Sequence, residues 1–184
     1  KILGSVINLA FNMLTSCNIK TNKEVILVNN DRYKSFIIWF TTRYKDVEFT
    51  PFVVPHDATE TVGYHINFNG IKFTFLTDLG EVTQDVIDYC KMSNVIIFES
   101  NYDLDMLLKG SYSPELKVRI MQGCGHLSNE QTASAIKRVY HKGLSHIFLC
   151  HLSENNNTPA KAYKQVAEAL DSIGVTADKD VHLS

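Results

Sequence analysis

The sequence predicts an α/β fold in which helices pack on a mixed sheet. Apolar and polar residues alternate on both sides of Asn69-Gly70, a pattern typical of a hairpin of half-buried strands. Two short continuous apolar runs, residues 95–98 and 147–150, are typical of strands buried on both faces. Segments with a helical apolar period lie between and after these runs. The order along the chain therefore favours layers of helices on a sheet.

The strands of the hairpin region follow one another closely. Residues 47–54 predict a strand, and residues 62–68 predict a second one with Ile66 on its buried face. The alternation places His65 on the outward face of that strand. After the turn, residues 71–77 continue as the paired strand.

Capping residues mark where the helices begin. A hydroxyl side chain that precedes an apolar helical stripe accepts from the first free backbone N–H groups of the helix. Four predicted helices start in this way, at Thr83, Ser113, Ser128 and Thr158. Ser128 and Gln131 also have the spacing of a capping box, and the helix that they open is expected to end near Gly143. A further helical turn over residues 104–108 is expected to end at Gly110.

Composition limits the classes of protein. The chain has 184 residues, of which 45% are hydrophobic and 21% charged, so we expect one domain over residues 1–184. The net charge of −2 does not impose a strong attraction to nucleic acid, and no apolar run is long enough to span a membrane. Four cysteines without CxxC spacing indicate free thiols and a cytoplasmic location. The apolar runs of residues 1–46 are compatible with strands or helices.

Imidazole and carboxylate side chains stand where the predicted strands end. His56, Asp78, Glu99 and His151 each close an apolar run, and His126 lies just before a helix start. Side chains at the ends of neighbouring strands can converge on one edge of a sheet. Imidazole nitrogen and carboxylate oxygen suit zinc, manganese or iron(II), and a carboxylate can bridge two cations. The pattern therefore indicates a metal site.

Five segments resemble one known family. The segments VPHDATETVGYHI, FLTDLGEVTQDVIDYC, NVIIFESNYDLDMLLKG, GHLSNEQTA and LCHLSENNN resemble, in order, motifs of the metallo-beta-lactamase fold. The resemblance is closest to the YycJ/WalJ branch, extends more distantly to RNase Z, and covers residues 47–173. It implies an αββα sandwich, two divalent ions (zinc or manganese), and hydrolysis of phosphodiester bonds in nucleic acid or nucleotides. It leaves a homodimer open.

The resemblance also implies a role for each of the five residues. His56, Asp78 and His151 match metal ligands, with Asp78 as the bridging carboxylate. His126 matches a histidine beside the scissile phosphate, and Glu99 matches the acid that supports it. His126 would then donate a proton to the leaving oxygen while Glu99 fixes its tautomer.

Ser128 and Asn129 are weaker candidates. They begin a helix, and the start of a helix attracts phosphate. Helix capping alone explains these two residues equally well.

One expected motif is absent. The family's HxHxDH motif, which supplies ligands to both metals, does not occur, and no histidine precedes His56. The start ILGS resembles the family's first strand and MLTSC a later one, so three explanations stay open: segments of the natural protein missing near residues 5–17, loss of the motif, or a fragment. Accordingly we keep three functions, namely a YycJ-like nuclease, a cyclic-nucleotide phosphodiesterase, and a catalytically degenerate binding protein.

Overall fold

The computed structural model describes residues 42–44, 46–58 and 61–184. The chain divides into two compact units, Lys1–Phe36 and Ile37–Ser184, and the description below concerns the second. The predictions made for residues 1–41, including the ILGS and MLTSC strands and a discontinuity near residues 5–17, lie outside the described residues. The prediction of a single domain over residues 1–184 therefore stays a prediction.

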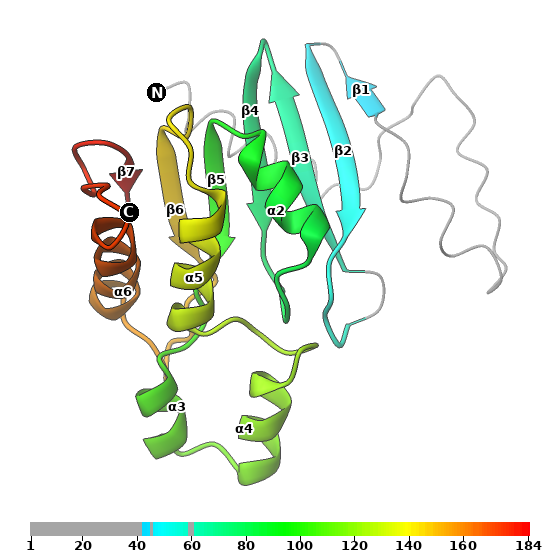
Figure 1. Ribbon diagram of the computed structural model, residues 1–184. Helices are drawn as coiled ribbons and strands as arrows, with labels where there is room; N and C mark the ends of the chain where they lie inside the picture. The colour runs from blue at the N-terminus through cyan, green and yellow to red at the C-terminus, as the bar shows by residue number, and fades with distance from the viewer. Residues whose placement is uncertain (1–41, 45, 59–60) are drawn as a thin grey trace, which may run out of the picture. The chain divides into compact units, whose positions relative to one another are not determined.

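Strands come first in the described part of the chain, and helices and strands follow in mixed order (Figure 1). In chain order the elements are β1 (Thr42–Tyr44), β2 (Val47–Val53), β3 (Val62–Phe68), β4 (Ile71–Leu76), α2 (Gln84–Lys91), β5 (Val95–Glu99), α3 (Leu104–Lys109), α4 (Pro114–Met121), α5 (Asn129–Val139), β6 (His146–Cys150), α6 (Pro159–Asp171) and β7 (His182–Leu183). The four predicted helix caps are confirmed, since each hydroxyl accepts a backbone N–H of its helix. The capping box at Ser128 is complete.

The strands form one mixed sheet of seven strands in the order β1 to β7. Neighbouring strands from β1 to β4 are antiparallel, and those from β4 to β7 are parallel. Because β2 and β4 are both antiparallel to β3, they run in the same direction as β5 and β6. The carboxyl ends of β2, β4, β5 and β6 therefore meet at one edge of the sheet, which we call the carboxyl edge.

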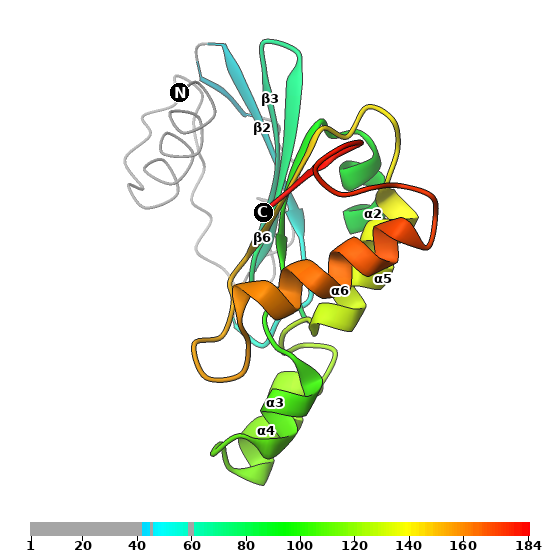
Figure 2. The ribbon, with the colours of Figure 1, turned by 90° about the vertical axis from the view of Figure 1, so that its left-hand side faces the viewer.

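Helices α2, α5 and α6 lie on one face of this sheet (Figure 2). Helices α3 and α4 extend beyond the carboxyl edge. None of the helices in the described part of the chain is long and apolar enough to cross a membrane.

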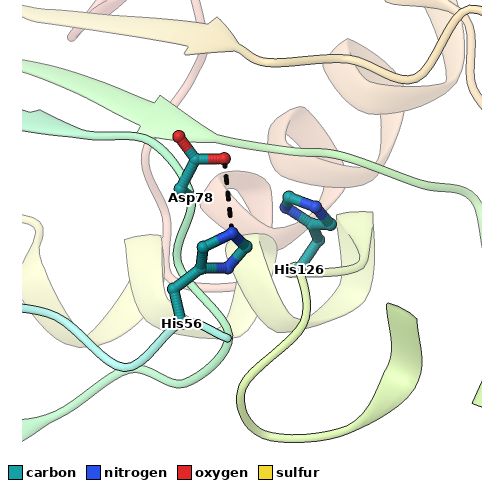
Figure 3. Close-up of side chains that lie close together, drawn as sticks. All are labelled: His56, Asp78 and His126. Atoms are coloured by element: carbon teal, nitrogen blue, oxygen red, sulfur yellow. Dashed lines mark ion pairs between the residues drawn. The ribbon is translucent and has the colours of Figure 1, made fainter. Parts of the chain in front are cut away.

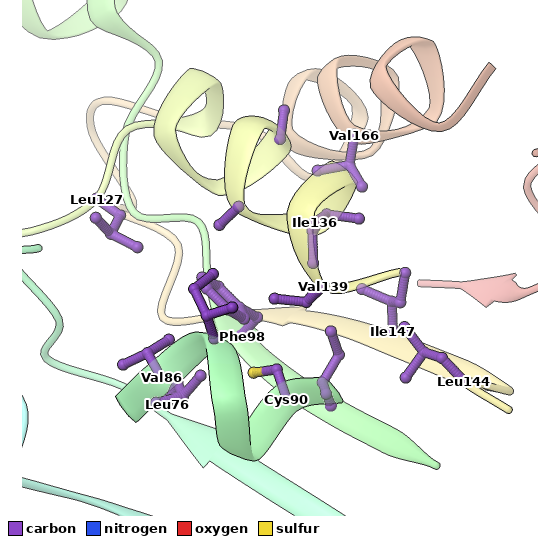
Figure 4. Packing of buried hydrophobic residues seen from close by; sticks show 14 of the residues in the cluster. Leu76, Val86, Cys90, Phe98, Leu127, Ile136, Val139, Leu144, Ile147 and Val166 are labelled. Carbon is purple, nitrogen blue, oxygen red and sulfur yellow. The ribbon is translucent and has the colours of Figure 1, made fainter. Parts of the chain in front are cut away.

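The core fills the space between the sheet and these helices (Figure 4). Phe98 of β5 is fully buried and belongs to the same cluster as Ile136 and Val139 of α5, while Val86 and Cys90 come from α2. All five residues of β5 are buried, which confirms the prediction for that strand. In β6 only Ile147 is buried and the other residues are half-buried, so the prediction was only partly correct there.

Three further details differ from the sequence predictions. His65 is not on an exposed face: it is 9% exposed, and its Nδ1 lies 3.0 Å from Thr74 Oγ1 and 3.3 Å from Ser93 Oγ. The alternation assigned the faces of β3 wrongly: Gly63 and His65 are buried, whereas Val62, Tyr64 and Phe68 are half-buried, and the His65 ring lies against Tyr89 of α2. Helix α5 ends at Val139, before Gly143, and the apolar residues of α4 are not buried.

Candidate metal site with an acid–base pair

The structure brings His56, Asp78, Glu99, His126 and His151 together at the carboxyl edge. Glu99 is the last residue of β5, and His56, Asp78 and His151 follow β2, β4 and β6. These four residues converge because their strands end at the same edge. His126 comes from the loop between α4 and α5, and its ring lies 4.9 Å from that of His56 and 5.2 Å from that of His151. The convergence that the sequence indicated is therefore present.

Asp78 lies between the imidazoles of His56 and His151; Figure 3 draws its contact with His56, together with the nearby His126. Its Oδ1 is 3.7 Å from Nε2 of His56 and 3.6 Å from Nε2 of His151. The other nitrogen of His56, Nδ1, donates to the backbone carbonyl of Gly125 at 2.9 Å. This bond places the proton on Nδ1 and leaves Nε2 with a free lone pair, which is the form that binds a metal.

Glu99 orients His126 and His151 through hydrogen bonds from their Nδ1 atoms. Its oxygen Oε1 accepts from His126 Nδ1 at 2.9 Å and from Leu127 N–H at 3.2 Å. Its oxygen Oε2 accepts from Leu79 N–H at 2.9 Å and from His151 Nδ1 at 3.2 Å. A carboxylate has about four acceptor positions, so these four donors use all of them. Glu99 therefore fixes both rings with Nε2 turned away from it, and has no position left for a metal.

The charge of Glu99 is stabilised in spite of its burial. The side chain is 0% exposed, and burial alone would raise its pKa. Hydrogen bonds from His126, His151 and the Leu79 N–H outweigh burial and hold the pKa of Glu99 below its usual value. The hydrogen bond between His151 and Glu99 raises the pKa of His151, although burial of the ring opposes this shift. Glu99, His126 and His151 thus form a group of one buried anion and two imidazoles.

Two of the site residues have an unfavourable backbone. Asp78 and His151 both have a φ of 55°, in the left-handed region that side chains with a Cβ rarely adopt. His151 comes directly after β6, and Asp78 lies two residues beyond β4. At both places the chain must turn sharply. Such backbone strain is typical of functional positions.

Two groups of these side chains offer metal ligands. The ligand atoms within each group lie within 4.8 Å of one another. The first group is His56, Asp78 and His126, and the second is Glu99, His126 and His151. His126 belongs to both. Because Glu99 already accepts four hydrogen bonds and orients His126, we regard His56, Asp78 and His151 as the better set of donors.

Ser128 and Asn129 have other partners than phosphate. The Ser128 hydroxyl accepts the Gln131 N–H, and the Ser128 N–H donates to the Gln131 side chain. Asn129 is 3% exposed and its side chain bonds to Ser100 and Asn157. The Ser128 contacts are those of a helix cap, and the phosphate role of both residues stays a prediction.

Comparison with known proteins agrees with this geometry. A family profile described as "Beta-lactamase superfamily domain" matches residues 15–151, which is more than half of the chain. The chain belongs to the beta-lactamase superfamily. The crystal structure of the metallo-beta-lactamase fold protein YhfI from Bacillus subtilis aligns with a TM-score of 0.54 at 13% identity, over 79% of this chain and 48% of that protein. The superfamily assignment and the metallo-beta-lactamase fold confirm the resemblance.

Curated members of the superfamily are similar in sequence. The chain is 34% identical over 147 residues to exodeoxyribonuclease YycJ of Bacillus anthracis, covering 80% of this chain and 56% of that protein. It is 31% identical over 160 residues to exodeoxyribonuclease WalJ of Streptococcus pneumoniae serotype 2 (strain D39 / NCTC 7466), covering 85% and 60%. The chain thus spans less than two thirds of the length of these relatives. The YycJ/WalJ branch is confirmed, and the fold implies divalent metal ions.

A network of buried amide side chains lies behind the site and was not predicted. Asn157 donates to the carbonyls of Ser100 and Asn101 at 2.8 and 3.1 Å and exchanges hydrogen bonds with Asn129. Asn101 in turn donates to the His151 carbonyl at 2.7 Å. Three buried amide side chains, those of Asn101, Asn129 and Asn157, therefore join the loops next to Glu99, His126 and His151. The run Asn155–157 is compatible with a polar loop near the site, but a plain turn into the helix that starts at Pro159 is the likelier interpretation of the sequence alone.

Proposed function

We propose that the protein hydrolyses phosphodiester bonds of nucleic acid with the help of two divalent cations, zinc or manganese. The observation that supports this best is the single Asp78 oxygen between two imidazole Nε2 atoms, next to a third imidazole held by a buried carboxylate. The names of the YycJ and WalJ relatives agree with a nuclease. A cytoplasmic location and a homodimer remain predictions.

The donor set fits divalent cations. His56 and His151 have their Nδ1 atoms engaged and their Nε2 atoms directed to the shared carboxylate of Asp78. We propose these three residues as ligands, in agreement with their matches to the family. When bound, two cations would activate a water molecule and neutralise the charge that develops on the phosphate.

His126 is proposed as the general acid. Its Nδ1 is held by Glu99 at 2.9 Å, and its side chain is about one quarter exposed, so Nε2 can reach a substrate. Glu99 stabilises the protonated ring and keeps its orientation. The protonated ring would give its Nε2 proton to the leaving oxygen. Glu99 is in this view a positioning residue, since it touches no reacting atom.

The test compares metal content with activity. We expect His126→Ala to retain the metal content of the wild type, measured by elemental analysis, and to lose most hydrolysis of labelled DNA oligonucleotides. Asp78→Ala should lose both metal and activity. His182→Ala, whose ring lies on β7 away from the carboxyl edge, is the matched control and should change neither. Loss of metal in His126→Ala would instead make His126 a ligand.

Metal content and hydrolysis, measured also with cyclic mononucleotides as substrate, decide between the alternative functions. A degenerate binding protein would contain no metal above trace and would cleave nothing after addition of zinc or manganese. A cyclic-nucleotide phosphodiesterase would hydrolyse cyclic mononucleotides faster than oligonucleotides of the same concentration.

A further inference from the structure

Arg119, in the last turn of α4, lies at the rim of the candidate metal site. Its Nε donates to Oδ2 of Asp57, the residue that follows His56. The other oxygen of Asp57, Oδ1, is 3.5 Å from Nε2 of His56. One carboxylate thus separates the guanidinium from a proposed ligand.

The position of Arg119 relative to the site is fixed by the backbone. His126 N–H donates to the carbonyl of Ile120 at 2.9 Å, and His56 donates to the carbonyl of Gly125. Gly125 lies so close to α4 that an added Cβ would be 2.4 Å from the carbonyl oxygen of Arg119. The end of α4 is therefore joined directly to the loop that carries His126.

The guanidinium retains unused hydrogen-bonding capacity. The Arg119 side chain is 66% exposed, and in the described part of the chain Asp57 is the partner that its guanidinium bonds. An arginine has five N–H donors in a planar fork, so the four N–H donors of its two terminal NH₂ groups remain. This geometry suits phosphate, which arginine binds through two parallel hydrogen bonds.

We propose that Arg119 binds a substrate phosphate next to the one that is hydrolysed. The reason is the position of Arg119: Asp57 and His56 stand between its guanidinium and Asp78, so Arg119 cannot contact the phosphate held at the metal ligands. A substrate that reaches both places must carry at least two phosphates in a row, as a polynucleotide does. The proposal rests on the proposed function and makes it more specific, since a substrate with one phosphodiester cannot use this contact.

The experiment compares two substrates and one matched pair of variants. Hydrolysis of a DNA oligonucleotide and of bis(p-nitrophenyl) phosphate, which has one phosphodiester, is measured for wild type, Arg119→Gln and Arg138→Gln. Arg138 lies in the last turn of α5 and serves as the control for loss of one exposed arginine. Oligonucleotide binding is measured separately by fluorescence anisotropy with a chelator present, at several salt concentrations.

We expect Arg119→Gln to lower the ratio of kcat/KM between oligonucleotide and bis(p-nitrophenyl) phosphate about tenfold, the effect of one lost charge-assisted contact. In the binding measurement, the slope of log K against log salt should fall by about 1. Arg138→Gln should keep both values. An unchanged ratio of kcat/KM would refute the phosphate contact. An equal loss on both substrates, together with a lower melting temperature, would also refute it, because the substitution would then act through stability.

The two proposals fail in different ways. Hydrolysis of neither substrate by the wild type would overturn the proposed function, while the anisotropy measurement would still decide whether Arg119 binds the oligonucleotide. Normal hydrolysis with an unaltered Arg119→Gln variant would overturn only the role of Arg119.

Discussion

Replacing Glu99 by glutamine should disturb the site more than the loss of one charge suggests. The glutamine side chain has the same shape, but one of its two ends is an NH₂ group that donates instead of accepting. At present each carboxylate oxygen accepts one imidazole Nδ1 and one backbone N–H. Whichever way the amide turns, its NH₂ end faces one histidine and one backbone N–H.

The two contacts respond differently. The backbone N–H, of Leu127 or of Leu79, cannot change and remains buried without a partner, which costs about 1–3 kcal/mol of stability. The facing histidine can move its proton from Nδ1 to Nε2 and accept from the amide. That histidine then has no lone pair on Nε2. If it is His151, a proposed ligand is lost. If it is His126, its Nδ1 accepts a hydrogen bond and cannot carry a proton, so the ring stays neutral and is a poor acid.

Urea unfolding with a chelator present and calorimetric titration with zinc measure the two effects separately. We expect Glu99→Gln to lose about 1–3 kcal/mol of unfolding free energy, and metal affinity to fall about 10- to 100-fold, as for other residues that orient metal ligands. Glu168→Gln, on the exposed side of α6, makes the same chemical change and should leave both quantities unaltered. If Glu99→Gln binds zinc like the wild type and unfolds at the same urea concentration, Glu99 does not position the site.

Three further predictions concern other parts of the structure. Gly125→Ala should lower both stability and metal affinity, because its Cβ would be 2.2 Å from the carbonyl oxygen of Ile120; Gly123→Ala in the same loop, with its nearest contact at 3.7 Å, should be tolerated in the same thermal melts. Burial lowers the pKa of His65 to about 4 from an unperturbed value of 6.5, so the unfolded chain binds the proton more readily in this range. Stability should therefore fall by about 2 kcal/mol from pH 7 to pH 5; His65→Gln should lack this part of the loss, and an equal loss in both proteins would contradict the assignment. Zinc at about 100 times its dissociation constant should add about 2.7 kcal/mol to the stability of the wild type; Asp78→Ala should gain less, and an equal gain would exclude Asp78 as a ligand.

The sequence was sufficient for most elements between residues 47 and 171. Helix starts were predicted correctly because a capping hydroxyl acts on N–H groups within three residues of itself, so the signal is local. The end of α5 was less certain, because Tyr140 ends the helix without a residue that marks the end. Strand β7 has two residues and owes its place to pairing with β6, which the local pattern does not show.

The residues of the candidate site could be predicted from the sequence, but the strand pairing and hydrogen bonds that join them could not. His56, Asp78, Glu99 and His151 follow from strand ends, since side chains at such ends meet once the strands run in one direction. The direction itself depends on pairing between β4, β5 and β6, which are separated by helices. The amide network of Asn157 could not be predicted for the same reason, because its partners lie 28 to 57 residues away.

The left-handed backbone at Asp78 and His151 has a consequence for engineering the protein. A φ near +55° costs a residue with a Cβ about 1–3 kcal/mol, and glycine avoids most of that cost. Glycine at either position would remove a proposed ligand and relax the chain at once. A search for more heat-resistant variants would therefore favour inactive ones at these two positions, and thermostability alone would be a misleading criterion for selecting improved forms.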